Sequence, residues 1–142
     1  MLKNPLYGLN SYDNSALIQS LSGKTPLLLS ADTTLAVANH SLQVGKYIEI
    51  AADAKTLTLP AVVVGASFII VNTANDGESL LTISPNASDK FLVDIDGAAG
   101  TDNKDIILAK ATQKQHDFVH LIGLSADGWL IHNVAGVWSD EA

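Results

Sequence analysis

The chain has no cysteine, few basic residues and no long apolar run, and each shortage removes a class of protein. Without cysteine it has no disulfide, no thiolate nucleophile and no thiolate-bound zinc or iron–sulfur centre. Its 8 Lys and Arg residues are scattered in a chain of net charge -7, so we expect no binding to nucleic acid. No run of about 18 apolar residues is present, so we expect no membrane span.

The N-terminal residues do not have the pattern of a signal peptide. Residues Met1 to Pro5 do not begin the apolar core of a signal peptide, so we expect synthesis in a cytoplasm. Charged residues make up only 16% of the 142 residues and hydrophobic ones 47%, which indicates a folded chain with a real core. Such a composition also favours exposed apolar surface, and large apolar patches usually mark surfaces that bind partners.

The stretch from Thr56 to Ile83 carries the strongest structural pattern. Leu57 and Leu59 alternate with threonines, which predicts a half-buried strand that ends at Pro60. The apolar run 67–71 predicts a buried strand, and the turn residues 72–77 precede a second apolar run at 80–83. We therefore predict that 67–71 and 80–83 are paired strands of a hairpin.

Short strands with turn signals between them follow each other through the rest of the chain. Besides those above, strands are expected at 27–29, 33–37, 47–50, 91–95, 105–110, 118–124 and 129–134. Asp127-Gly128 is the best hairpin signal. No βαβ alternation suggests a parallel sheet, and no repeat of fixed period is visible. The predicted fold is all-β: an antiparallel sandwich, jelly roll or barrel-like domain over 26–142.

Residues 1–25 differ from this pattern and are predicted to form an extended N-terminal arm. A short helix over 14–21 is possible within it, capped by Asp13 or Asn14. We expect the arm to dock on a neighbouring subunit, with an arm folded on its own domain as the alternative. The residues predicted to contact a partner are its apolar ones: Leu2, Pro5, Leu6, Tyr7, Tyr12, Leu17, Ile18 and Leu21.

Two groups of side chains are candidates for a metal site. The acidic loop 94–105 has the length of an EF-hand loop, but Ala98 and Ala99 stand at its fifth and sixth positions, so a solvated loop is predicted. His120 lies near a cross-strand position to His132, whereas His116 would lie about 13 Å away from His120 along the same strand. A two-histidine metal site is possible, but no third ligand is evident, and surface histidines are predicted.

Signals for catalysis are weak. Gly23-Lys24-Thr25 resembles the end of a phosphate-binding loop, but Ile18 stands where the first glycine is required. No Gly-x-Ser-x-Gly sequence is present. Tyr47, Trp129 and Trp138 could stack on sugars, although the favoured interpretation is that Trp129 packs the hairpin and Trp138 anchors the C-terminus. We therefore expect no enzyme, no catalytic residue and no cofactor.

Several short motifs of the sequence resemble those of a known protein family. Thr58-Leu59-Pro60-Ala61, Gly65-Ala66-Ser67-Phe68, Val71-Asn72-Thr73 and Leu81-Thr82-Ile83-Ser84-Pro85 with Asp89 resemble a pattern in virion proteins of tailed bacteriophages. Phe118-Val119-His120-Leu121-Ile122-Gly123 with Gly128-Trp129 resembles the closing hairpin of the same proteins. The likeness covers over half of the chain, from about Thr56 to Val134, and its motifs are structural.

These virion proteins include capsid decoration (cement) proteins and domains of tail fibres. The resemblance implies a homotrimer on the outer surface of the head, where it binds the major capsid protein, bridges capsomers and stabilises the shell. The alternative is a tail-fibre or receptor-binding module that recognises glycans. The resemblance carries over no catalytic residue.

Overall fold

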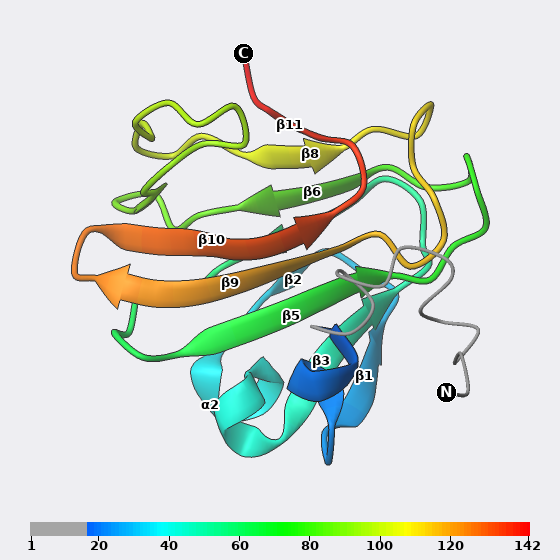
Figure 1. Ribbon diagram of the computed structural model, residues 1–142, viewed down its shortest axis with the longest axis horizontal. Helices are drawn as coiled ribbons and strands as arrows, with labels where there is room; N and C mark the ends of the chain where they lie inside the picture. Colours follow the sequence, from blue (N-terminus) through cyan, green and yellow to red (C-terminus); the bar gives the residue numbers. More distant parts are fainter. Residues whose placement is uncertain (1–16) are drawn as a thin grey trace, which may run out of the picture.

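The computed structural model describes residues 17–142, which form two mixed β-sheets with few helical residues (Figure 1). The first sheet has the spatial order β1 (Thr25–Leu29), β3 (Lys46–Ile50), β5 (Ser67–Asn72), β9 (Phe118–Ser125), β10 (Gly128–Ala135), β7 (Lys90–Phe91). The second has the order β11 (Trp138–Asp140), β8 (Ile106–Leu108), β6 (Leu81–Ser84), β4 (Lys55–Thr58), β2 (Thr33–Thr34). Helix α2 (Val37–His40), the 3-10 turn η2 (Leu42–Val44) and a helical segment at 17–21 complete the described elements.

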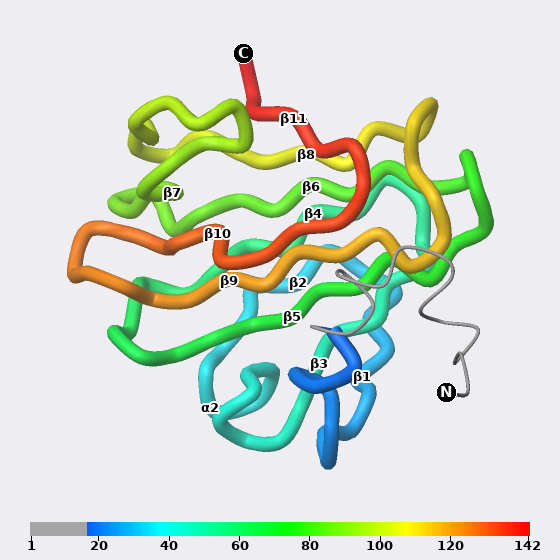
Figure 2. The backbone as a smooth tube through the Cα atoms, in the orientation of Figure 1, coloured from blue at the N-terminus to red at the C-terminus, as the bar shows by residue number. Residues whose placement is uncertain are grey.

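Over the first half of this range the chain winds between the two sheets as a coil. Strands β1, β3 and β5 are neighbours in the first sheet, and β2, β4 and β6 are neighbours in the second, so each successive strand changes sheet. Every neighbouring pair within these two sets is parallel. Figure 2 follows this winding from the blue to the green part of the chain. Each coil therefore contributes one strand to each sheet.

The β-rich class agrees with the prediction, but the expectation of antiparallel sheets is wrong for this half. Parallel strands need a long crossover connection, which is usually a helix. Here the crossover from one strand to its parallel neighbour is a strand of the opposite sheet, so the sequence shows no helical period between them. The absence of a βαβ pattern was therefore a poor guide to strand direction.

The predicted hairpin of 67–71 with 80–83 is also wrong. The two runs do form strands, but β5 belongs to the first sheet and β6 to the second. Gly77 has the positive φ of a turn glycine (φ 74), and the turn carries the chain across to the other sheet. Likewise the strand predicted over 33–37 ends at Thr34, and Val37 begins α2.

The second half of the chain adds mainly antiparallel strands. β9 pairs with β5 and β8 pairs with β6, both antiparallel, so each sheet changes strand direction next to the last coil. β9 and β10 form the hairpin that Asp127-Gly128 predicts, and this prediction is confirmed. Strand β7 is the exception, because it pairs parallel to β10 at the edge of the first sheet.

The main hydrophobic core fills the space between the two sheets. Phe68 of β5 packs against Trp129 of β10, with ring centroids 5.5 Å apart. Trp138 of β11 is also buried, and its Nε1 donates a hydrogen bond to the carbonyl of Ala135. Both tryptophans are thus packing residues, as favoured from the sequence, and neither presents a free face for stacking on a sugar.

None of the helices within residues 17–142 has both the length and the apolar character needed to cross a membrane.

Candidate functional site

The predicted partner-binding residues of the arm fall into two groups. Leu2, Pro5, Leu6, Tyr7 and Tyr12 lie outside the described residues. The other three, Leu17, Ile18 and Leu21, lie on the helical segment 17–21 at the start of the described range. Only these three can be placed against the rest of the domain.

Leu17 and Leu21 pack against their own domain. They contact a second, smaller apolar cluster on the outer face of the first sheet, made of Ile69, Val71 and Phe118. Those three side chains are buried although they point away from the main core. The structure therefore gives Leu17 and Leu21 a covering role within the subunit, and a partner contact for them stays a prediction.

Ile18 differs from its two neighbours on the same helical segment. It is 50% exposed, so its side chain projects away from the covered cluster and is accessible to another molecule. The three apolar residues that the sequence placed on one face of a helix therefore have two different environments.

Three exposed apolar residues lie on two neighbouring segments, the turn before β5 and the end of β9. Val63 and Val64 lie in the connection from β4 to β5, and Leu124 lies near the end of β9. Val64 is 65% exposed and Leu124 55% exposed. We call these three residues the β4–β5 patch. Exposed large apolar residues on neighbouring segments favour a contact with another protein.

The backbone holds the β4–β5 patch at one end of the β9–β10 hairpin. The Gly65 N–H donates to the carbonyl of Gly123, and the Gly123 N–H donates to the carbonyl of Ala66, both at 2.8 Å. Gly65 takes a left-handed conformation (φ 86), which lets the chain turn from Val64 into β5. Pro60 ends the preceding strand as the sequence predicts, so the valines lie on a tethered turn.

The open edge of strand β1 is poorly suited to binding a further strand. In residues 17–142, β1 pairs only with β3 and leaves its other side open. The Thr25 N–H points toward β3, where it donates to Gly45, so the alternation of a parallel strand directs Pro26 toward the open side. A proline there removes one donor, which disfavours addition of another strand at this edge.

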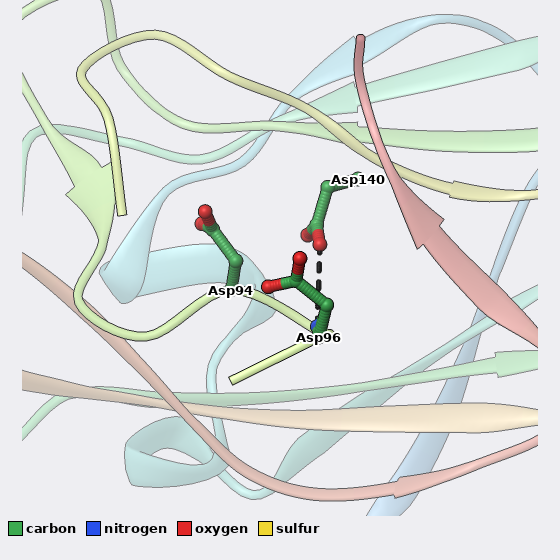
Figure 3. A group of neighbouring side chains, drawn as sticks. All are labelled: Asp94, Asp96 and Asp140. Carbon is green, nitrogen blue, oxygen red and sulfur yellow. Dashed lines mark hydrogen bonds between the residues drawn. The ribbon is translucent and has the colours of Figure 1, made fainter. Parts of the chain in front are cut away.

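Two carboxylates of the acidic loop and one of β11 form a cluster, shown in Figure 3. Ligand oxygens of Asp94, Asp96 and Asp140 all lie within 4.8 Å of one another. Asp140 comes from β11, far along the chain, and its carboxylate accepts hydrogen bonds from the backbone N–H groups of Ile95 (3.0 Å) and Asp96 (3.3 Å). This carboxylate therefore ties the loop to β11.

The surroundings of Asp94 and the shape of the loop fit a structural role. Burial, followed by the nearby charges of Asp140 and Asp96, raises the pKa of Asp94. Val93 and Ala99 form an isolated antiparallel bridge, so the loop closes tightly on itself rather than opening into an EF-hand. The sequence could suggest the loop but not Asp140, because nothing local to β11 marks its contact.

The two histidines of the β9–β10 hairpin do meet, as their distances from the turn predict. The ring centroids of His120 and His132 are 5.0 Å apart and the rings are nearly perpendicular. Burial and the neighbouring His132 lower the pKa of His120 to about 4. His116 lies outside this pair, in the loop before β9.

No protein-family model and no curated protein sequence matches the chain.

Proposed function

We propose that the protein is a structural component of a tailed-bacteriophage virion, a decoration protein that binds the outer surface of the capsid. In this proposal three copies associate and contact the major capsid protein, and they stabilise the shell by bridging neighbouring capsomers. No chemistry is carried out, so the protein is not an enzyme. It acts by burying apolar surface at the contact between neighbouring capsomers.

The observation that carries the proposal is the β4–β5 patch. It exposes two valines on a turn held by backbone hydrogen bonds to β9, and a leucine near the end of β9 itself. A pre-positioned apolar surface loses little conformational freedom when it binds, so more of its burial appears as affinity. Three copies in one trimer would multiply this effect, because tethered contacts act at a high effective concentration.

The residues that carry the family resemblance give a second line of support. Thr58-Leu59-Pro60-Ala61 lies at the end of β4, and Gly65 to Phe68 leads into β5. The segment 118–123 lies in β9, and Gly128-Trp129 opens β10. Several of the resembling motifs therefore surround the β4–β5 patch, so a protein built on them would present a turn at the same place.

The glycan-binding alternative loses its main support in the fold. Of the three side chains expected to stack on a sugar, Trp129 and Trp138 are buried, and Tyr47 is partly buried against the outer cluster of the first sheet.

The test is binding to capsids of the phage that encodes the chain, prepared without this protein. The purified protein should sediment as a trimer, bind those heads in many copies and raise the temperature at which they rupture. Wild-type protein that neither binds the heads nor changes their rupture temperature would refute the proposed function.

Matched variants then locate the contact. Val64→Asp should weaken binding to the heads, because it places a charge in the apolar contact. Val137→Asp is the control: Val137 is 61% exposed but follows β10, at the opposite end of the hairpin. Equal loss of binding in both variants would argue against the β4–β5 patch while leaving a virion role intact.

A further inference from the structure

The histidine pair lies on the outer face of the first sheet. Val119 and Leu121 on either side of His120 belong to the main core, so alternation along β9 directs His120 to the opposite face. His132 is exposed and its ring is in edge-to-face contact with that of His120. The pair is therefore accessible from solvent although His120 itself is partly buried.

A β-bulge brings the second ring to this face. Ile131 lies opposite Leu121 and Asn133 lies opposite His120, so His132 is an extra residue without a partner of its own in β9. Bulges change the direction of a side chain and often occur next to functional sites. In a regular ladder only one residue of β10 would lie opposite His120, and the bulge adds His132 beside it.

We propose that His120 and His132 form a two-histidine site for a divalent transition-metal ion such as Zn²⁺ or Cu²⁺. The spacing supports this. A zinc–nitrogen bond is about 2.0–2.1 Å, which puts each ring centre roughly 3.2 Å from the metal and two tetrahedral ligands roughly 5 Å apart, centre to centre. The observed separation of the two centroids is 5.0 Å.

The rings need little movement to bind. A histidine ring turns about its Cβ–Cγ bond over a broad range, and this rotation brings a nitrogen toward the metal while the ring centre hardly moves. Within residues 17–142, no hydrogen bond to protein occupies a ring nitrogen of His120 or His132. Neutral imidazole is the binding form, and the low pKa of His120, about 4, keeps its ring neutral near pH 7.

Imidazole nitrogen suits zinc, copper and nickel, and of these Cu²⁺ binds a given nitrogen site most tightly. Solvent completes the coordination, because two protein ligands leave positions open. A metal bound here joins β9 to β10 across the bulge and stabilises the folded chain, since the unfolded chain does not hold the two rings together. This inference is independent of the proposed virion role.

The test is a titration of the full chain with Zn²⁺ at pH 7.5, followed by calorimetry. We expect one ion per chain, and a rise in the unfolding temperature that excess EDTA reverses. His132→Asn removes one ligand at an exposed position and should weaken binding about tenfold or more. His116→Asn, which changes an exposed histidine outside the pair, should bind Zn²⁺ like the wild type.

A second measurement uses the wild-type protein, so a folding defect in a variant cannot affect it. In proton–nitrogen spectra, substoichiometric Cu²⁺ should broaden the signals of His120 and His132 before those of His116 and His40. The inference is overturned if His132→Asn binds Zn²⁺ as tightly as the wild type, or if Cu²⁺ broadens the pair no sooner than the other histidines. A stoichiometry of one ion per two or three chains would also overturn it.

Discussion

Gly123 of β9 lies directly against the backbone carbonyl of Val63. A Cβ atom built on Gly123 would come within 2.2 Å of that oxygen, which is far inside van der Waals contact. The two backbone hydrogen bonds on either side, from Gly65 to Gly123 and from Gly123 to Ala66, leave the strand little room to retreat. The turn that carries Val63 and Val64 is thus seated on β9 at a position that accepts only glycine.

The first prediction follows from this contact. Gly123→Ala should destabilise the domain by about 2 kcal/mol, because an added methyl group in a packed site forces the backbone apart. Leu124→Ala, at the next and largely exposed position, should change stability by less than about 0.5 kcal/mol. Urea denaturation of the two variants measures the difference, and equal midpoints would show that the turn can shift without cost.

The second prediction concerns the aspartates of the turns between the sheets. Asp32 Oδ1 accepts the Thr56 N–H at 2.9 Å, one coil further along the chain. Asp53 does the same with Leu80 at 2.8 Å, and Asp76 with Gln115 at 2.9 Å. Each aspartate therefore joins its own turn to a later part of the chain.

Asp32→Ala should cost about 1 kcal/mol of unfolding free energy, because it leaves the Thr56 N–H without its protein acceptor. Asp32→Asn keeps a side-chain oxygen at the same place and should lose clearly less. The comparison by urea denaturation separates the hydrogen bond from the charge. Identical stability of the wild type and both variants would mean that the aspartate does not hold the coils together.

The third prediction is a dependence of stability on pH. The folded protein lowers the pKa of His120 from 6.5 to about 4, through burial and then through repulsion by His132. On acidification, the His120 ring of the unfolded chain binds a proton at a higher pH than the ring of the folded protein does. The folded state therefore has its full stability with respect to this group above about pH 6.5, and it loses stability as the pH falls from there toward 4. Partial exposure of the ring reduces the size of the loss to about 1 kcal/mol.

Carboxylates also titrate in this range, so the measurement is a difference between two proteins. The free energy of unfolding is measured at pH 7.5 and pH 4.5 in EDTA for the wild type and for His120→Gln. The wild type should lose more stability on acidification than the variant. A loss of the same size in both would assign the pH dependence to other groups.

The sequence predicted where the strands lie better than how they are arranged. Alternation at Leu57 and Leu59 and the turn at Asp127-Gly128 are local signals, and both gave correct elements. The pairing of β5 with β3 and β9 depends on contacts between distant segments, which no local pattern records. The coils show no repeat of fixed period in the sequence because their connections differ in length. The connection from β2 to β3 contains α2 and η2, whereas the connection from β4 to β5 contains no helix.

The same limit applies to the candidate sites. The sequence placed His120 and His132 near each other because a single short turn joins their strands. It did not bring Asp140 to Asp94, since those residues meet only through the packing of the chain end against the acidic loop. It also grouped Leu17, Ile18 and Leu21 on one helix face without showing which of them the first sheet covers.

The last prediction separates the two possible roles of that helical segment. Leu21 is partly buried against Ile69, Val71 and Phe118, so Leu21→Ala should cost about 1–2 kcal/mol, below the range for fully buried leucines. Ile18 is half exposed, and Ile18→Ala should leave stability within about 0.5 kcal/mol of the wild type. In binding to phage heads the order should reverse, with Ile18→Ala the weaker binder once both proteins are folded at the assay temperature. Loss of stability in Ile18→Ala, or unchanged binding by it, would leave the segment as a cover for its own sheet and remove Ile18 from the partner contact.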